Sequence, residues 1–317
     1  MASFFSYLRS LFTGGCDDAS RDLVSRIVEA HTTLVNLDSL QPGEITNKTL
    51  GGLVSLCCES HDSSTINKVL THPRIQSILP SLRHISSASE CCLESYWADQ
   101  IVSRSRSSTE ALSLLKSFPY FQNYVDLARL ELHALYAVEP APVSRIAFVG
   151  SGPLPLTSMC LLRSLRDGGD DDNVVEEEEK KERPTVMNID HNATALSAST
   201  VLCEKLGSWS AGMAFRCSDA NSDQDLSSFD VVFLAALVGV TQRDKEEIVI
   251  SVARRMRKGA LMVVRSAYGL KTVLYPEVEL SSRRICKVLQ VETVTHPYGN
   301  VVNSVIVARV KGLALPT

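Results

Sequence analysis

The spacing of hydrophobic and polar positions changes near residue 140, and this change divides the chain into two predicted parts. Before it, apolar residues recur at intervals of three and four, the pattern of helices with one buried face. After Arg145, short apolar runs alternate with helical segments, as in folds built on a parallel sheet. We therefore predict an all-helical domain over residues 1–140 and an α/β domain over residues 141–317.

The first part is predicted to be a bundle of helices. One helix follows the possible N-caps Asp17, Asp18 and Ser20, carries an apolar face through Leu37, and ends before Pro42. The other predicted helices cover residues 47–59, 65–71, 81–104, 109–118 and 122–138. The residues before Asp17 are predicted to form a short separate helix. They lack the basic leader and the cleavage site of a signal peptide.

The second part is predicted to contain five strands in β/α units, followed by an antiparallel hairpin. The strands cover residues 146–149, 185–189, 212–217, 231–237 and 261–264, and the hairpin covers residues 288–295 and 301–310. This is the layout of S-adenosylmethionine-dependent methyltransferases. The predicted fold class is therefore α/β, with a methyltransferase-like (Rossmann-type) sheet preceded by an N-terminal helical bundle domain.

Composition and charge indicate an ordinary globular protein. The chain has 317 residues, 44% of them hydrophobic, and a mean hydropathy of +0.04. No apolar run reaches the ~20 residues of a membrane span, so we predict no membrane partner. The net charge of −4 disfavours nucleic acid as a partner. Residues 166–183 hold nine acidic and four basic side chains, and we predict a solvated, disordered loop there.

The nine cysteines are scattered and form no CxxC pair, and no two histidines stand four residues apart. This pattern disfavours a zinc site and a disulfide framework. Reduced thiols fit better, and they predict a cytoplasmic protein without a metal.

The stretch RIAFVGSGPLPLT, residues 145–157, is the strongest candidate for a ligand site. An apolar strand runs into Gly150-Ser151-Gly152, and a helix follows. Small residues let the backbone approach a ligand, and a helix N-terminus adds N–H donors. Pro155 takes the third position of the GxGxxG fingerprint, which disfavours NAD. No GxxxxGK[ST] loop for ATP is present.

Polar residues after the next two strands favour S-adenosylmethionine as the ligand. Asn188 and Asp190 suit the ribose hydroxyls, and Asp219 suits the adenine amino group. Each acid has an alternative role as a cap of the following helix or loop. The predicted cofactor-binding residues are Gly150, Ser151, Gly152, Pro153, Leu154, Asn188, Asp190, Asp219, Ala220 and Ala236.

Five stretches carry a resemblance to one family. They are GSGPLPLTS (150–158), FPYFQNYVDLARLE (118–131), VVFLAALVG (231–239), LMVVRSAYGL (261–270) and VVNSVIVAR (301–309), with weaker support from SASECCLESYW (87–97). In this order they resemble nicotianamine synthases, whereas methyltransferases at large do not share the FPYxxNY segment.

The resemblance implies an unusual transferase reaction. Three S-adenosylmethionine molecules are joined by aminocarboxypropyl transfer rather than methyl transfer, and an azetidine ring closes. The products are nicotianamine, a metal chelator that serves metal homeostasis, and methylthioadenosine. The enzyme itself needs no metal.

The implied chemistry needs a base, because the attacking α-amine must be deprotonated. Glu90 and Glu94 stand at i, i+4, next to the apolar stripe of the predicted helix over residues 81–104. Two like charges near buried surface raise one pKa, which suits a base. The resemblance places a functional glutamate here. We align it with Glu90 and keep Glu94 as the alternative; both could instead be solvated or paired with Arg83 or Arg104.

Four further residues are predicted to act in catalysis or to hold the substrate. Tyr124 is a catalytic candidate and Tyr120 a substrate-binding one, with aromatic core residues as the alternative. Arg265 suits a substrate carboxylate, with a surface ion pair as the alternative. Asn303 suits a substrate contact or a turn.

Departures from the family pattern leave the number of transfer rounds open. Asn188 stands where plant members usually carry an acid, and Ser89-Glu90-Cys91 replaces Ala-Glu-Gly. The alternatives are a related synthase with a shorter product, a small-molecule methyltransferase, and a non-catalytic interaction protein. The lack of an Asn/Asp-Pro-Pro-Tyr motif after the fourth predicted strand disfavours N-methylation. The sequence leaves the oligomeric state open.

Overall fold

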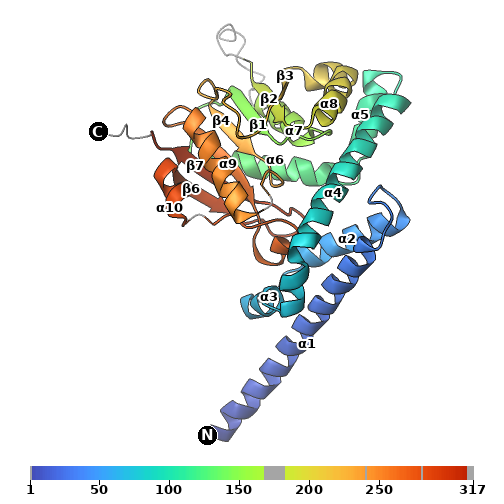
Figure 1. Ribbon diagram of the computed structural model, residues 1–317, viewed down its shortest axis with the longest axis vertical. Coiled ribbons are helices and arrows are strands. Elements are labelled where there is room, and N and C mark those ends of the chain that lie inside the picture. Colours follow the sequence, from blue (N-terminus) through green and yellow to red (C-terminus); the bar gives the residue numbers. More distant parts are fainter. Residues whose placement is uncertain (1, 168–182, 240, 280, 313–317) are drawn as a thin grey trace.

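A seven-stranded sheet and a group of helices from the first half of the chain make up the molecule (Figure 1). The computed structural model describes residues 2–167, 183–239, 241–279 and 281–312, with side chains from residue 18 onward. Most of the predicted acidic loop, residues 168–182, lies outside the described residues. None of the described helices is both long and apolar enough to cross a membrane.

The helices before the first strand follow the predicted pattern with two corrections. They are α1 (Ala2–Val35), α2 (Glu44–Cys58), α3 (Ser63–Leu70), α4 (Pro73–Arg104), α5 (Ser108–Lys116) and α6 (Phe121–Tyr136). The prediction of a separate N-terminal helix is wrong, because α1 continues through the possible caps at Asp17 and Asp18. The long helix starts at Pro73, where proline fits the first turn, and it passes through Pro80. Proline normally disrupts a helix interior, which is why the sequence pattern placed the start after it.

The strands alternate with helices as predicted. The strands are β1 (Arg145–Val149), β2 (Thr185–Asp190), β3 (Met213–Cys217), β4 (Val231–Leu234), β5 (Leu261–Ser266), β6 (Leu289–Thr295) and β7 (Ser304–Val310). The helices among them are α7 (Leu156–Asp167), α8 (Ala193–Leu206), α9 (Gln242–Arg255) and α10 (Arg283–Val288), with the short 3-10 helices η2 (Gly207–Ser210) and η3 (Gly269–Val273). The predicted fourth strand is too long by three residues, because residues 235–237 leave the ladder after Leu234.

The strand order β3-β2-β1-β4-β5-β7-β6 confirms the predicted methyltransferase-like sheet. Strands β1 to β5 are parallel, and β7 is antiparallel to both β5 and β6. The order reverses between β1 and β4, and ligands bind at such a reversal, beyond the carboxyl ends of the strands.

Three hydrophobic clusters hold these elements together. One face of the sheet packs against α4 to α8, and the other packs against α9 and α10. The third cluster joins α1 to α4 with η3, through Leu270, Val273 and Leu274. Helices from the first part and strands from the second thus share a core, and the domain boundary near residue 140 stays a prediction.

The stacked pair Phe148–Phe233 lies at the centre of the sheet face that the first-half helices cover. The ring centroids are 5.9 Å apart, the planes differ by 12°, and Phe233 is 1% exposed. Phe233→Ala is expected to lower the free energy of unfolding by about 3–5 kcal/mol, because it leaves a cavity. Val201→Ala on α8, where the residue is 44% exposed, should change it by less than about 0.5 kcal/mol. Urea denaturation measures both, and equal losses would contradict the packing described here.

Candidate active site

The turn after β1 has room for glycine only. Gly150 and Gly152 have φ angles of +83° and +66°, in the left-handed region that side chains disfavour. A Cβ on Gly150 would lie 2.3 Å from the Val238 Cγ2 atom, and one on Gly152 would lie 2.7 Å from the Glu94 Oε2 atom. The turn is therefore pressed between the segment after β4 and helix α4.

Asp190, at the end of β2, holds this turn in place. Its Oδ2 atom accepts a hydrogen bond from the Gly152 N–H at 2.9 Å, and its Oδ1 atom accepts one from the Asn192 N–H at 2.9 Å. Asn192 caps α8 instead, so the alternative role of Asp190 as the helix cap is wrong. Asp219 has the alternative role predicted for it, as a cap of its own loop, because its Oδ1 atom accepts a hydrogen bond from the Asn221 N–H at 2.7 Å.

A cavity of about 370 Å³ opens beyond the carboxyl ends of β1, β2 and β4. Nine of the ten residues predicted to bind the cofactor line it: Gly150, Ser151, Gly152, Pro153, Leu154, Asp190, Asp219, Ala220 and Ala236. Their arrangement matches the predicted site, although their contacts with a ligand stay a prediction.

Asn188 is the exception and is not brought to the cavity. It lies inside β2 between β1 and β3, fully buried, and its Nδ2 atom donates to the Ala214 carbonyl at 3.2 Å. The cavity begins beyond the end of the strand, and Asn188 stands two residues short of that end. Its proposed contact with a ribose is therefore withdrawn.

A second cavity, of about 650 Å³, lies between α2, α4, α6 and the segments that flank β7 and η3. It shares Glu90, Glu94, Tyr124, Arg265 and Asn303 with the first cavity. The rest of its wall is largely apolar, and it includes Leu50, Trp97, Phe118, Tyr120 and Leu274. Two ligands can therefore meet at one set of ionisable side chains.

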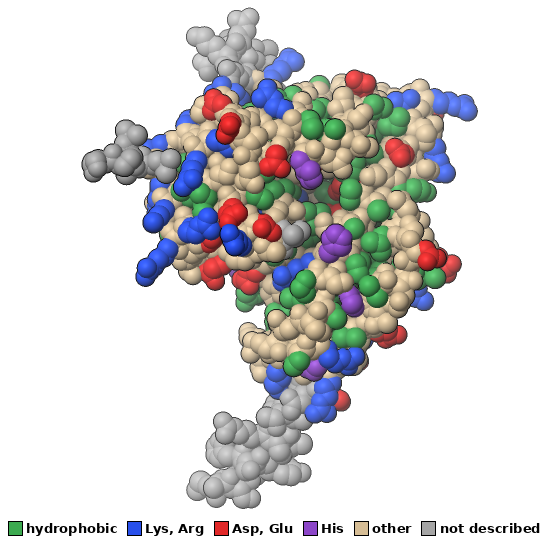
Figure 2. Space-filling model, in the orientation of Figure 1, with side chains coloured by type: hydrophobic (Ala, Val, Ile, Leu, Met, Phe, Trp, Pro, Cys, Tyr) green, Lys and Arg blue, Asp and Glu red, His purple; other side chains and the backbone are tan. Residues whose placement is uncertain are grey.

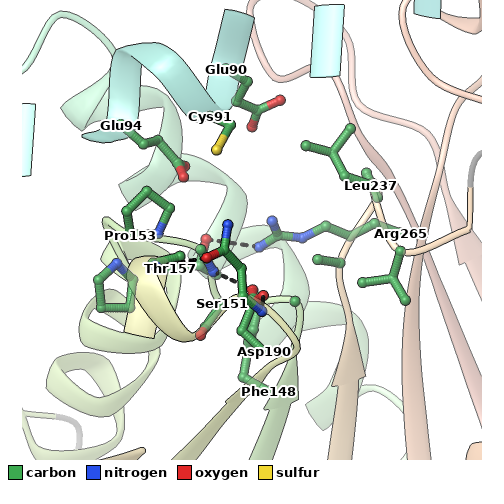
Figure 3. Close-up of a pocket in the computed structure, with 18 of the residues that line it drawn as sticks. Glu90, Cys91, Glu94, Phe148, Ser151, Pro153, Thr157, Asp190, Leu237 and Arg265 are labelled. Atoms are coloured by element: carbon green, nitrogen blue, oxygen red, sulfur yellow. Dashed lines mark hydrogen bonds between the residues drawn. The ribbon is translucent and has the colours of Figure 1, made fainter. Parts of the chain in front are cut away.

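Glu94 points from α4 toward Pro153 of the glycine turn, and Glu90 lies on the same helix beside Cys91 (Figure 3). The Tyr124 hydroxyl lies 2.7 Å from the Glu94 Oε1 atom and 3.3 Å from the Glu90 Oε1 atom. The Tyr275 hydroxyl donates to the Glu90 Oε2 atom at 2.7 Å. The alternative pairing with Arg83 is wrong, because that guanidinium donates to the Thr272 carbonyl.

Burial sets the ionisation of this group. It raises the pKa of Glu90, and it raises the pKa of Glu94 further because Glu90 adds like-charge repulsion. Burial and the two carboxylates also raise the pKa of Tyr124 well above its usual value, so its hydroxyl keeps its proton. A buried carboxyl pair of this kind titrates as a unit and can share one proton between its members.

Arg265, at the end of β5, provides the positive charge in the wall between the cavities. Its Nε atom donates to the Glu131 Oε1 atom at 2.7 Å, and its Nη2 atom donates to Glu131 Oε2 at 3.1 Å and to Thr157 Oγ1 at 2.9 Å. Burial disfavours the charged guanidinium, but Glu131 outweighs it and raises the pKa of Arg265. The pair is buried, so the alternative of a surface ion pair is wrong. Within the described residues, the Nη1 atom has no acceptor.

Asn303 offers a second donor. Its side chain is 8% exposed, and its Nδ2 atom has no partner among the described residues. It lines both cavities together with Arg265. The arrangement suits a ligand carboxylate between the guanidinium and the amide.

Lys245 of α9 supports the first cavity from behind. It is 1% exposed, and its Nζ atom donates to the carbonyls of Ala235 and Ala236 at 2.7 and 3.0 Å. Burial, and then the charge of Arg265, lower the pKa of Lys245 to about 7. The lysine thereby fixes the segment after β4 that presses on Gly150.

Sequence reasoning missed Thr157 and Tyr275, and it considered Glu131 only as a cap or as a partner near Arg129. Glu131 follows Tyr124 by seven residues, two helical turns on one face, which is a signal that could have placed it on the side of α6 that faces the site. Thr157 lies in the first turn of α7, where many residues serve only the helix. Tyr275 follows an irregular segment, and no local pattern indicates its contact with Glu90.

The fold and the cavities define the class of protein. A Rossmann-like sheet with an antiparallel β7, and a ligand cavity at the strand-order reversal between β1 and β4, are the features of proteins built like S-adenosylmethionine-dependent methyltransferases. The helices before β1 add a second feature, because α4 and α6 supply Glu90, Glu94 and Tyr124 to the wall of this cavity.

The chain belongs to the nicotianamine synthase family. The family model described as "Nicotianamine synthase protein" matches residues 16–314. The chain is 35% identical to nicotianamine synthase 9 of Hordeum vulgare, over 90% of this chain and 78% of that one. It is 30% identical to nicotianamine synthase 1 of Arabidopsis thaliana, over 92% and 84%.

The fold is also similar to a solved structure described as a glutamate-to-glutamine mutant of MtNAS in complex with S-adenosylmethionine. The TM-score is 0.71 at 19% identity, and the match covers 91% of this chain and 98% of that one. Because the identity is low, this likeness concerns the fold alone.

The buried ion pair yields a stability prediction. Glu131→Gln is expected to cost about 3–5 kcal/mol of unfolding free energy, because it removes the carboxylate charge that is hydrogen-bonded to the buried Arg265 guanidinium. Asp126→Asn, on the same helix, breaks the exposed pair with Arg129 and should cost less than about 1 kcal/mol. Chemical denaturation at neutral pH compares them. A small effect of Glu131→Gln would show that Arg265 is stabilised by other groups.

Gly152 yields a binding prediction. Gly152→Ala adds a methyl group 2.7 Å from the Glu94 carboxylate, so we expect S-adenosylmethionine affinity to fall at least tenfold. Gly259→Ala is the matched control, since Gly259 has φ +85° but open space around its Cβ position. It should lower the melting temperature without changing affinity. Calorimetric titration separates the two variants, and equal affinities would contradict the role given to the turn.

Proposed function

We propose that this protein is a nicotianamine synthase. It condenses three S-adenosylmethionine molecules by aminocarboxypropyl transfer and azetidine ring closure, and it releases methylthioadenosine. Its family membership and the names of its relatives support this activity. The observation that carries it is the meeting of two cavities at Glu90, Glu94 and Tyr124.

The smaller cavity is proposed to hold the donor. The glycine turn lets the backbone approach the amino acid part of S-adenosylmethionine, and Asp190 and Asp219 lie where the ribose and the adenine need acceptors. Ala220 and Ala236 leave room along the wall. This orientation directs the sulfonium toward the wall that the cavities share.

The larger cavity is proposed to hold the acceptor. Its apolar wall accommodates the hydrocarbon part of the growing product, while Arg265 and Asn303 receive a carboxylate. Tyr120, which is half-buried in this wall, can hold an amine or a carboxylate. The acceptor amine then faces the two glutamates.

The proposed step needs one base and a fixed geometry. A glutamate takes a proton from the acceptor ammonium, and the amine electron pair forms a bond to the carbon γ to the donor carboxylate. The bond from this carbon to sulfur breaks, and its electron pair returns to sulfur, which leaves neutral methylthioadenosine. The sulfonium is a good leaving group, so catalysis is positioning plus proton removal.

Several other expectations remain proposals. A cytoplasmic location is supported by the free thiols of the described cysteines. Figure 2 shows basic and acidic side chains interspersed on the face it displays, rather than a basic surface suited to nucleic acid. Catalysis without a metal also remains a proposal, as do small molecules as the partners.

Incubation of the purified protein with S-adenosylmethionine alone tests the function. Mass spectrometry should find nicotianamine and methylthioadenosine. S-adenosylhomocysteine would instead indicate a methyltransferase, and a smaller condensation product would indicate fewer transfer rounds. The absence of methylthioadenosine would refute the proposal.

The base is tested in the same assay. Glu90→Gln should lower the rate of methylthioadenosine release by about 100-fold or more, because it removes the proton acceptor and keeps the shape. S-adenosylmethionine binding should persist. Asp99→Asn, an exposed site on the same helix, is the control and should keep wild-type activity. Full activity of Glu90→Gln would exclude Glu90 as the base.

A further inference from the structure

Tyr275 makes the contact that distinguishes the two glutamates. It donates to the Glu90 Oε2 atom at 2.7 Å, while the Glu90 Oε1 atom lies 3.3 Å from the Tyr124 hydroxyl. The Glu94 Oε1 atom lies 2.7 Å from the Tyr124 hydroxyl. Its Oε2 atom lies next to Gly152, 2.7 Å from where a Cβ atom would stand. The Tyr124 hydroxyl has one proton for the two glutamates, whereas the Tyr275 hydroxyl bonds to Glu90 and, among the described residues, not to Glu94.

The surrounding charges favour the same difference. Glu90 is faced by Glu94 on its own helix, by Tyr124 and Tyr120 from α6 and its N-cap, by Tyr275 after η3, and by Arg265 from β5. Glu94 is faced by Glu90 and Cys91 on its own helix, by Tyr124, Tyr275 and Arg265, and, in addition, by Asp190 from β2. The Asp190 carboxylate repels a negative charge on Glu94, so a single negative charge on the pair is more stable on Glu90.

The segment that carries Tyr275 is fastened independently of this contact. Arg83 of α4 donates two hydrogen bonds to the Thr272 carbonyl, at 2.9 and 2.7 Å. Lys271 donates to the carbonyls of Pro297 and Val301 at 2.9 and 2.6 Å. Because α4 also carries Glu90, the helix and the tyrosine are held at a fixed distance before any ligand binds.

We propose that Tyr275 is a positioning residue that makes Glu90, and not Glu94, the carboxylate that takes the proton from the attacking amine. The inference rests on the proposed synthase reaction. Glu90 is the ionised member of the pair, and Glu94 keeps its proton. In the step, the ammonium proton passes to a Glu90 oxygen, and the freed electron pair of nitrogen forms the new bond to carbon.

Tyr275→Phe tests this assignment, since it removes the hydroxyl and keeps the ring. Without the donor the pKa of Glu90 rises, so the acidic limb of kcat/KM for methylthioadenosine release should move to higher pH by about one unit. At a pH above the limb, activity should return to within about threefold of wild type. Tyr268→Phe, on the same segment and 53% exposed, should leave the profile unchanged. A loss that is equal at every pH would show a purely structural role and overturn the proposal.

Infrared difference spectra during a pH titration give a second readout, which does not depend on turnover. The band of a protonated carboxyl at neutral pH should vanish in Glu94→Gln, because that variant removes the protonated member of the pair. Persistence of the band in Glu94→Gln would place the proton on Glu90 and overturn the assignment. Failure of wild-type protein to release methylthioadenosine would refute the synthase function itself, whereas an active wild type with an unshifted Tyr275→Phe profile would refute only the role of Tyr275.

Discussion

The balance of charge around Arg265, away from bulk water, is the constraint on which the site depends. One guanidinium faces Glu131 on one side and the Glu90–Glu94 pair on the other, and all of these groups are costly to ionise without partners. The ion pair between Arg265 and Glu131 also has a structural effect. Arg265 belongs to β5 and Glu131 to α6, so the ion pair fixes the helix that carries Tyr124 against the edge of the sheet that borders the two cavities. The same bond therefore sets both the electrostatics and the shape of the site.

The site is assembled from segments that are far apart in the sequence, and each is held by contacts of its own. The glycine turn is bound by Asp190, and the segment after β4 is bound by Lys245. Helix η3, which leads to Tyr275, is bound by Arg83. All of these contacts are made within the chain itself. The walls of the two cavities are thus positioned by folding, which suits a reaction whose main requirement is that two substrates meet in a fixed orientation.

Features with a local pattern could be predicted from the sequence, and features that depend on distant segments could not. The turn around Gly150 and the pair Glu90 and Glu94 are visible in the order of residues, because strand, turn and helix spacing decide them. Asn188 was assigned to the ligand although it lies inside the predicted strand over residues 185–189, where the neighbouring strands β1 and β3 bury its side chain. Tyr275 was missed because its partner lies on a helix 185 residues earlier in the chain. The buried Arg265–Glu131 pair was missed because its two members are also far apart in the chain. A second cause is that charged residues are usually exposed, so a surface ion pair was expected for Arg265.

The position of β7 between β5 and β6 has a consequence for how the protein is made. During synthesis β6 leaves the ribosome before β7, yet it has no neighbour in the sheet until β7 has paired with β5. Until then the edge of β5 is an open row of backbone donors and acceptors, which invites pairing with other chains. The segment that brings Asn303 to the cavities precedes β7 directly and is placed in the same event. The nascent chain therefore acquires its glycine turn early, and it completes both its sheet and its ligand cavities only when the last strand has emerged.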